Sequence, residues 1–220
     1  MLTEVAGSSS RPGMFPLGRT ARIAVLASGR GSNLASLLAA FPPGHGAGPA
    51  DVQPQQLGSL ALVISNKPNA PALTVARAAG VDAVYVAWDA EHPRSLFESE
   101  VTRLLDGAGI DLVCLAGFMR VLSPEFTERY AGRLLNIHPS LLPDFRGLHA
   151  QRQALAAGVS EAGCTVHLVD GGVDTGQALV QLRVPVLPGD TEATLSERIL
   201  AAEHLAYPQA VSAVLRGVRP

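Results

Sequence analysis

The chain has 220 residues, of which 47% are hydrophobic and 16% charged, so it can bury a sizeable core and is not intrinsically disordered. Its formal net charge is −2, from 17 Lys and Arg against 19 Asp and Glu, and the cations are scattered along the chain. Nucleic-acid-binding proteins cluster their cations, so we expect no nucleic-acid partner. No apolar stretch reaches the roughly 18–20 residues that a membrane-spanning helix needs, so we expect no membrane association.

The first 20 residues and the two cysteines carry little chemistry. Residues 1–20 are rich in Gly, Ser, Pro and Arg and lack an apolar signal-peptide segment, so we interpret them as a loose extension. Cys114 and Cys164 lie in apolar, strand-like runs, which is typical of buried reduced thiols rather than of a disulfide or a metal pair. We therefore expect a cytoplasmic protein with one catalytic domain at residues 21–220.

Strand-like and helical segments alternate from residue 22 to residue 137. The expected strands are 22–27, 60–64, 82–86, 111–116 and 134–137. The expected helices are 34–38, 71–79 and 94–105, where apolar side chains recur at helical spacing. A Pro- and Gly-rich segment at 41–58 is predicted to be a long surface loop. Continuous apolar strands separated by helices predict a parallel sheet that is covered on both faces.

The pattern changes after residue 155. Two runs with strand character, 165–169 and 178–186, are separated by a Gly-rich turn, which predicts an antiparallel addition to the sheet. Thr191 is placed to be the N-cap of a final helix that extends to Leu215. The predicted fold class is therefore α/β: a single-domain, Rossmann-like, mostly parallel sheet with helices on both faces and an antiparallel C-terminal addition.

The segment 29–33 joins the first predicted strand to the first predicted helix. Gly29 and Gly31 would let the backbone approach an anion, and the free amides at the helix start would point towards it. Alone this pattern is weak, because it lacks the third glycine of a dinucleotide fingerprint and the Gly-Lys-Ser/Thr of a P-loop. The alternative is a tight turn with Ser32 as the helix N-cap. Beside the motifs described next, a monophosphate site is favoured.

The segment Asn136–Pro143 presents an amide, an imidazole and a hydroxyl directly after an apolar strand. Open α/β sheets bind ligands beyond the carboxyl ends of their strands. Asn136 and His138 are two positions apart, so on a strand their side chains share one face. An amide can donate to the oxyanion of acyl transfer, and an imidazole can donate to it and carry a proton. Three neighbouring polar groups favour this role over a structural histidine.

A carboxylate beside His138 would hold up the pKa of its imidazole, as an acid working near neutral pH requires. Asp174 is the candidate, and Asp170 in the same Gly-rich turn is the rival. A lone Asp in such a turn is more often a turn former, so the turn alone does not assign the role.

Several motifs together resemble those of the phosphoribosylglycinamide formyltransferases, folate-dependent enzymes of de novo purine synthesis. They are Gly31–Asn33, Ala116–Ser123, Asn136–Pro143, Gly147–His149 and Asp174–Gly176, in the order and approximate spacing of that family. The resemblance extends from about residue 22 to residue 216. Two features depart from the family pattern: the loop at 41–58 is longer than in many members, and Gln177 stands where proline often follows the Asp-Thr-Gly turn.

The resemblance implies a role for each of these motifs. The implied catalytic residues are Asn136, His138 and Asp174. The implied contacts to glycinamide ribonucleotide are Gly31, Ser32, Asn33 and Glu203. The implied contacts to 10-formyltetrahydrofolate are Arg94, Met119, Arg120, Val121, Leu122 and Asn136. On the residues alone, Arg94 would be a solvated helix charge and residues 118–122 the end of a core strand.

The expected reaction is direct attack of the glycinamide ribonucleotide amine on the formyl carbon of 10-formyltetrahydrofolate, the co-substrate. The His and Cys residues lack zinc spacing and no Gly-x-Ser-x-Gly elbow occurs, so we expect neither a metal nor a covalent acyl-enzyme. His167 and His204 are interpreted as structural, and His149 has no assigned role. The expected partners are these small molecules, and a homodimer is possible.

Three alternatives are considered. A formyltetrahydrofolate hydrolase would use water in place of the amine, but those enzymes usually carry an additional N-terminal regulatory domain. A methionyl-tRNA formyltransferase would carry a basic C-terminal RNA-binding domain, for which the chain has no room. A catalytically inactive binding module on the same fold is the alternative outside enzymes, because fold does not fix function.

Overall fold

The computed structural model describes residues 15–44 and 56–218. Within this part of the chain seven strands form one sheet in the order β3-β2-β1-β4-β5-β6-β7. The strands are β1 (Ala21–Leu26), β2 (Gly58–Ser65), β3 (Asp82–Tyr85), β4 (Leu112–Leu115), β5 (Leu134–His138), β6 (Glu161–Leu168) and β7 (Ala178–Pro185). Most of the predicted extension, residues 1–14, and most of the predicted loop, residues 45–55, lie outside the described residues.

The sheet is parallel from β3 to β5 and antiparallel at β6 and β7, as the sequence predicts. After β1 the chain builds outwards through β2 and β3, then returns to place β4 on the other side of β1. The order of strands therefore reverses between β1 and β4. Such a switch point opens a crevice beyond the carboxyl ends of the two strands, where α/β proteins bind ligands.

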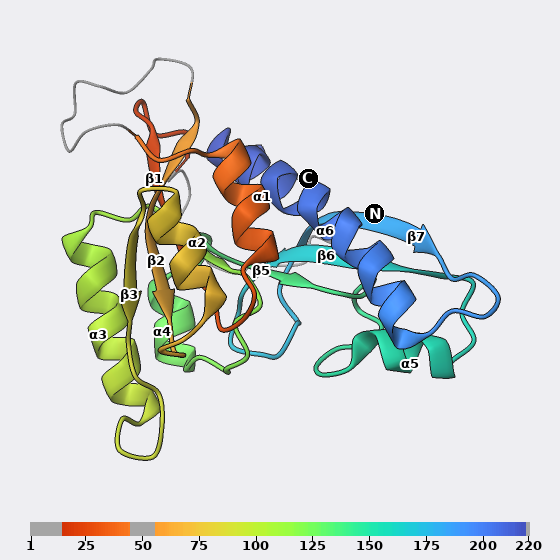
Figure 1. Cartoon of the computed structure of the whole chain (residues 1–220). Helices are drawn as coiled ribbons and strands as arrows, with labels where there is room; N and C mark the ends of the chain where they lie inside the picture. The colour runs from red at the N-terminus through yellow and green to blue at the C-terminus, as the bar shows by residue number, and fades with distance from the viewer. Residues whose placement is uncertain (1–14, 45–55, 219–220) are drawn as a thin grey trace, which may run out of the picture.

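Helices cover both faces of the sheet (Figure 1). They are α1 (Ser32–Ala40), α2 (Pro71–Ala78), α3 (Arg94–Gly107), α4 (Pro124–Arg129), α5 (Ala150–Ala156) and α6 (Glu192–Leu215). Ile23 and Val25 of β1 belong to the core under α1, α2 and α6, whereas Ala24 and Leu26 belong to the core under α3 and α4. This burial on both faces explains why the strand reads as a continuous apolar run.

Several elements differ from the sequence-based expectation. Strand β6 begins at Glu161 rather than at residue 165, because its first half contains a glycine that carries no strand signal. A Cβ at Gly163 would lie 2.1 Å from the carbonyl oxygen of Leu182 on β7, so the close approach of the two strands requires glycine there. Helices α4 and α5 were not predicted; they have only six and seven residues, too few to show a helical period.

The C-terminal helix α6 is the longest element and lies over β6 and β7 beside α1 (Figure 1). Thr191 is its N-cap, as predicted: the Thr191 hydroxyl accepts a hydrogen bond from the Thr194 amide, and the Thr194 hydroxyl accepts one from the Thr191 amide. Within the described residues, none of the helices is both long and apolar enough to cross a membrane.

The residues just before β1 contact the sheet domain. Phe15 and Leu17 pack against the main core, and the Arg19 guanidinium forms a bidentate pair with Asp111, with both N···O distances at 2.7 Å. The proposed division into an extension at 1–20 and a domain at 21–220 remains a prediction.

Candidate active site

The loops that follow β1 and β4 are tied together at the switch point. The Ser28 amide donates to the carbonyl oxygen of Gly117 at 3.2 Å, and the Ser28 hydroxyl accepts from the Met119 amide at 3.2 Å. The same hydroxyl donates to Asn66 Oδ1 at 2.7 Å. The loops after β1 and β4, which we call the two walls of the candidate site, are therefore fixed to one another by polar contacts.

The first wall contains the glycine-rich turn into α1. Gly31 is the N-cap residue, with φ at +83°, so the alternative that assigned this position to Ser32 is wrong. A Cβ on Gly31 would lie 2.9 Å from the Cα of Ala72, so glycine is required both for the backbone angle and for the contact with α2. No side chain caps α1, which leaves its first amides available to an anion.

Asn33 joins this turn to the C-terminal helix. Its Nδ2 donates to Glu203 Oε2 at 2.7 Å, and both side chains are buried. Burial raises the pKa of Glu203, and the bond from Asn33 only partly opposes that rise. Asn33 Oδ1 has no hydrogen-bond partner among the described residues. A buried acceptor without a donor is costly, and a ligand hydroxyl or amine could satisfy it.

The three predicted catalytic residues lie together. Asn136 and His138 are on β5, and Asp174 lies in the turn between β6 and β7. His138 Nδ1 is 3.2 Å from Asp174 Oδ2, and Asn136 Nδ2 is 3.4 Å from Asp174 Oδ1. The strand alternation places Asn136 and His138 on one face, and the β6–β7 turn folds back to place the carboxylate against both.

Asp174, and not Asp170, faces the histidine. Asp170 Oδ1 accepts from the Gly172 amide at 3.0 Å and from the Thr175 hydroxyl at 2.6 Å, so Asp170 is the residue that forms the turn. Burial raises the pKa of Asp174, but its contact with His167, the hydrogen bond from the Gly147 amide and the nearby His138 leave that pKa below its usual value. The carboxylate is therefore held ionised beside the imidazole.

His138 meets a hydrogen-bond acceptor at each ring nitrogen. Nδ1 faces Asp174, and Nε2 is 2.9 Å from the carbonyl oxygen of Phe145. A carbonyl oxygen and a carboxylate can only accept, so the imidazolium satisfies both partners at once. The ring can thus hold a proton that it later gives up, as a general acid must. Phe145, at φ +55°, has left-handed backbone geometry uncommon for a non-glycine residue.

His167 also belongs to this cluster, although sequence reasoning left it as a structural residue. On β6 it pairs with Asn136 on β5, and its Nε2 lies 3.2 Å from Asn136 Nδ2 and 3.5 Å from Asp174 Oδ1. Nothing in the local sequence reveals this position, because the register between two antiparallel strands depends on how the chain folds back. His149 is the N-cap of α5 and is exposed.

The second wall of the crevice is the segment that follows β4. Met119 and Val121 are 71% and 61% exposed, unusual values for apolar side chains, whereas Leu122 is buried. The Arg120 guanidinium lies 5.3 Å from the centroid of the Trp88 ring and donates to the Trp88 carbonyl oxygen at 3.2 Å. Exposed apolar side chains of this kind are suited to a flat heterocyclic ligand.

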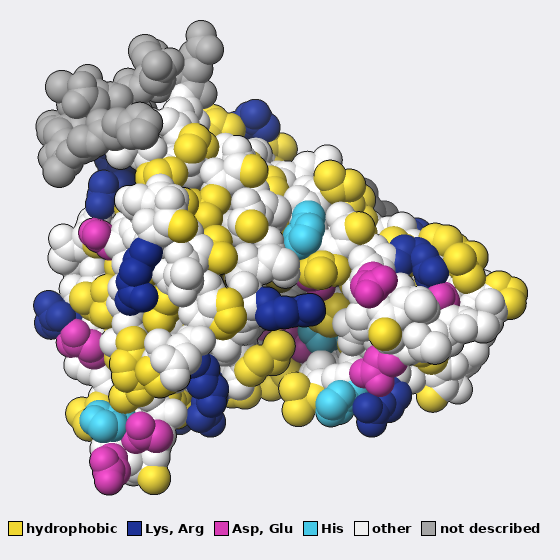
Figure 2. Space-filling view, in the orientation of Figure 1, with side chains coloured by type: hydrophobic (Ala, Val, Ile, Leu, Met, Phe, Trp, Pro, Cys, Tyr) yellow, Lys and Arg dark blue, Asp and Glu magenta, His cyan; other side chains and the backbone are white. Residues whose placement is uncertain are grey.

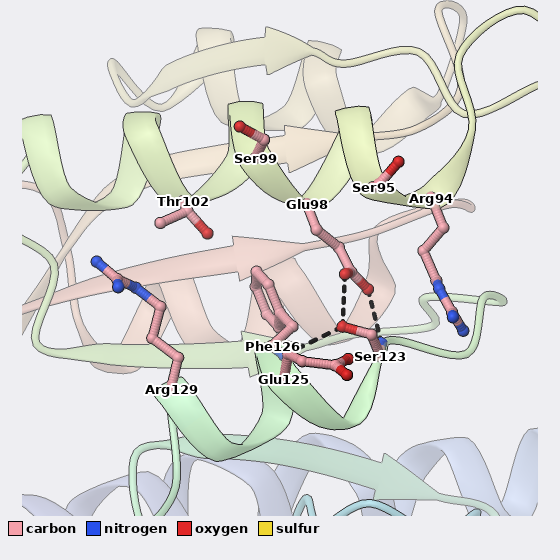
Figure 3. A pocket seen from close by; sticks show the side chains of 9 residues that line it. All are labelled: Arg94, Ser95, Glu98, Ser99, Thr102, Ser123, Glu125, Phe126 and Arg129. Atoms are coloured by element: carbon pink, nitrogen blue, oxygen red, sulfur yellow. Dashed lines mark hydrogen bonds between the residues drawn. The ribbon is translucent and has the colours of Figure 1, made fainter.

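Arg94 lies apart from these groups, at the start of α3. It is exposed and lines a groove between α3 and α4 (Figure 3), in which Glu98 reaches across to accept from the Ser123 amide and hydroxyl, both at 2.6 Å. Arg129 lies at the opposite end of this groove. Among the described residues Arg94 forms no hydrogen bond or ion pair with Arg120 or with the catalytic cluster, and its folate role remains a prediction.

Charges on the surface are dispersed. On the face drawn in Figure 2, Lys and Arg side chains are scattered and form no single cationic patch. Several arginines of the described residues are paired with acids, for example Arg103 with Glu100 and Arg129 with Asp106. Exposed pairs of this kind contribute little stability, and they leave no concentrated positive field on this face.

The fold, together with the clustered amide, imidazole and carboxylate, is suited to acyl transfer. The family model for formyl transferases matches residues 21–211. This chain therefore belongs to the formyl transferase family.

Relatives of known name resemble most of the chain. The phosphoribosylglycinamide formyltransferase of Escherichia coli (strain K12) is 42% identical over 190 residues, 86% of this chain and 85% of that protein. The trifunctional purine biosynthetic protein adenosine-3 of Drosophila melanogaster is 49% identical over 199 residues. These residues are 90% of this chain but only 14% of the insect protein, which is much longer.

Solved structures give the same result. The crystal structure of glycinamide ribonucleotide transformylase 1 from Symbiobacterium toebii superimposes with a TM-score of 0.81 and is 44% identical, covering 91% of this chain and 90% of the other. The corresponding values for the phosphoribosylglycinamide formyltransferase from Anaplasma phagocytophilum are 0.79 and 40%, covering 89% and 87%. The predicted mostly parallel fold with its antiparallel C-terminal strands is thereby confirmed.

Proposed function

We propose that this protein transfers the formyl group of 10-formyltetrahydrofolate to the amine of glycinamide ribonucleotide, a step of de novo purine biosynthesis. The main support is that Asn136, His138 and Asp174 converge at the end of β5, in a chain that belongs to the formyl transferase family. The relatives that match this chain over most of both lengths carry the name of that activity.

In the proposed reaction the substrate amine attacks the formyl carbon directly. A new C–N bond forms, the bond from the formyl carbon to the folate nitrogen breaks, and one amine proton replaces the formyl group on that nitrogen. The Asn136 amide and the His138 imidazolium donate to the oxyanion that forms in between; one such donor is typically worth about 2.7–4 kcal/mol. Asp174 holds the imidazolium in place with its charge balanced.

His138 must exchange one of its partners during turnover. Its Nε2 hydrogen points at the Phe145 carbonyl oxygen, and this is the proton that can be redirected to the substrate because Nδ1 remains on Asp174. A proton given up at Nε2 is returned from the amine, so the ring is restored in each cycle. The proton reaches the leaving nitrogen directly or through a water molecule.

The substrates are assigned to the two walls of the crevice. Gly31, Ser32 and Asn33 offer backbone amides and an unpartnered side-chain acceptor to the ribose phosphate, and Glu203 lies beside them. On the opposite wall the folate contacts are Met119, Arg120, Val121 and Leu122, with Arg94 and with Asn136 between the two substrates. The pteridine would lie on the exposed Met119 and Val121 side chains, and its edge would bond to their backbone.

The deciding experiment measures the fate of the formyl group. Purified protein is mixed with 10-formyltetrahydrofolate, with and without glycinamide ribonucleotide, and the formyl product is identified. We expect formyl glycinamide ribonucleotide to accumulate only when both substrates are present. Formate release at equal rates in both mixtures would instead identify a hydrolase. Calorimetric binding of both ligands without any turnover would identify an inactive binding module.

Assembly and location are further parts of the proposal. We propose a cytoplasmic enzyme that acts on small molecules without a nucleic-acid or membrane partner, and a homodimer is the assembly to test. Sedimentation equilibrium of the purified chain measures its mass directly, and cell fractionation locates it.

A further inference from the structure

We propose that His167 is a positioning residue, which holds the carboxamide of Asn136 so that one of its amide hydrogens is directed to the reacting formyl oxygen. This inference rests on the proposed function, because it concerns the same reaction. His167 is 2% exposed and lies on β6, directly opposite Asn136 on β5. Its contacts determine which end of the carboxamide the ring can hold.

The backbone fixes the tautomer of the His167 ring. Nδ1 is 2.8 Å from the carbonyl oxygen of Leu168, and a carbonyl oxygen can only accept, so Nδ1 carries the hydrogen. In the neutral ring Nε2 is then left with a lone pair. The ring of His167 therefore presents a hydrogen-bond acceptor to whatever faces its Nε2 atom.

The group that faces Nε2 is the amide nitrogen of Asn136, at 3.2 Å. The contact of the same ring atom with Asp174 is longer, at 3.5 Å. One amide hydrogen of Asn136 is thus held by His167. The second points to Asp174 Oδ1 at 3.4 Å, a long contact that an oxyanion can displace because a charge-assisted hydrogen bond is shorter and stronger.

If the Asn136 carboxamide rotated by half a turn, it would present its oxygen to the substrate. The oxyanion would then lose the donor that it needs. The acceptor on His167 opposes this turn, because its lone pair would then face the lone pairs of Asn136 Oδ1. His167 thereby favours the productive orientation without contacting either substrate. The three polar groups Asn136, His167 and Asp174 form one network, in which each orients the next.

Two substitutions separate this role from a purely structural one. In His167→Asn, the short carboxamide can replace Nδ1 and keep the bond to the Leu168 carbonyl oxygen, but it has no atom at the Nε2 position. In His167→Gln, the longer side chain can place its oxygen where Nε2 was and accept from Asn136. The measurements are kcat, the KM for each substrate, and the melting temperature of each variant, with assays run below the lowest melting temperature.

We expect His167→Asn to lower kcat about 10–100-fold with both KM values within about threefold of wild type, less than the loss of about 10²–10³ typical when a donor itself is removed. His167→Gln should recover at least tenfold of that loss. The proposal would be overturned if His167→Gln lost more kcat than His167→Asn, or if both variants lost the same amount. It would also be overturned if kcat were unchanged in both, or if KM rose in parallel with the loss of kcat.

A double-mutant cycle with Asn136→Ala keeps the proposal testable if stability also falls. When the amide is absent, His167→Asn should change kcat by less than about twofold, because the two residues act through one interaction. A further tenfold loss in that background would overturn it. Wild-type protein assayed alongside separates the two claims: without turnover by wild type the proposed function fails, whereas normal wild-type turnover with a fully active His167→Asn refutes the positioning role alone.

Discussion

Asp174 receives contacts from the backbone and from three side chains of the catalytic cluster. The Gly147 amide donates to Oδ2 at 2.9 Å, His138 Nδ1 lies 3.2 Å from the same oxygen, and Asn136 Nδ2 faces Oδ1. Three groups that offer hydrogens thus converge on one carboxylate, and His167 Nε2 lies 3.5 Å from Oδ1. Removal of its charge should therefore affect both the chemistry and the stability of the site.

The substitution Asp174→Asn tests this role with little change of shape. An asparagine cannot balance an imidazolium, and its NH2 group would face another donor, so we expect kcat to fall by about 10²-fold or more at neutral pH. The KM for glycinamide ribonucleotide should change little, since the proposed phosphate-binding turn, residues 29–33, lies on other elements. Steady-state kinetics measure this, with circular dichroism as a check on folding. Full turnover by the variant would remove Asp174 from the mechanism.

Wild type and Asp174→Asn should also differ in how their stability depends on pH. The pKa of Asp174 is lowered in the folded state, so its contribution to stability is present above the unfolded value of about 3.9 and is lost as the pH falls through the folded pKa. The difference in free energy of unfolding between wild type and Asp174→Asn should therefore be largest near neutral pH and should disappear as the pH falls below about 4. Urea denaturation at a series of pH values measures this difference.

The pKa of Glu203 is shifted in the opposite direction from that of Asp174, so its effect on stability has the opposite dependence on pH. Burial raises its pKa, so its folded form prefers the proton; stability is full below the unfolded value of about 4.3 and is lost as the pH rises through the folded pKa. Because glutamine imitates the protonated acid, Glu203→Gln should be more stable than wild type at pH 8 and no different below about pH 4. Its KM for glycinamide ribonucleotide should rise. A variant that is less stable than wild type at pH 8 would contradict this account.

At the scale of elements, the turn between β1 and α1 depends on one glycine. Gly31 has φ at +83°, and a Cβ there would lie 2.9 Å from the Cα of Ala72 at the start of α2. In Gly31→Ala we expect a loss of about 1–2 kcal/mol from the left-handed backbone alone, with a further loss because α2 must move away. The KM for glycinamide ribonucleotide should rise more than the KM for the folate.

Gly80 offers a matched control for that prediction. Its φ is +75°, similar to that of Gly31, but nothing lies within 4 Å of a Cβ at that position. Gly80→Ala should therefore show the backbone cost in a denaturation experiment and leave both KM values unchanged. If the two variants had the same stability and kinetics, the contact with Ala72 would have no part in shaping the proposed phosphate-binding turn.

The sequence predicted the elements whose burial is two-sided or whose ends carry strong signals. Strands such as β1 are continuous apolar runs, and Thr191 marks the start of α6. The spacing of Asn136 and His138 likewise fixed their shared face. What the sequence could not supply were relations between elements. The position of His167 opposite Asn136 depends on the register of β5 with β6, which no local pattern encodes.

At the scale of the whole molecule, α6 connects the two halves of the site. Glu203 on this helix accepts a hydrogen bond from Asn33 of the turn after β1, and Tyr207, four residues later, lies on the same face of the helix. The Tyr207 hydroxyl lies 2.9 Å from the carbonyl oxygen of Leu115 on β4 and 3.2 Å from that of Leu135 on β5. One helix thus fixes the strand that carries Asn136 relative to the turn that would bind phosphate.

The substitution Tyr207→Phe removes that connection and keeps the ring. Tyr207 is fully buried, so the lost hydrogen bond should lower the free energy of unfolding by about 0.5–1.5 kcal/mol, measured in urea with an unchanged m value. A small fall in kcat should accompany it, because β5 would be held less firmly beside β4. Tyr85, 41% exposed on β3, provides the control: Tyr85→Phe should alter neither quantity, since this side chain is exposed. Equal effects of the two substitutions would mean that α6 does not brace the catalytic strand through this hydroxyl.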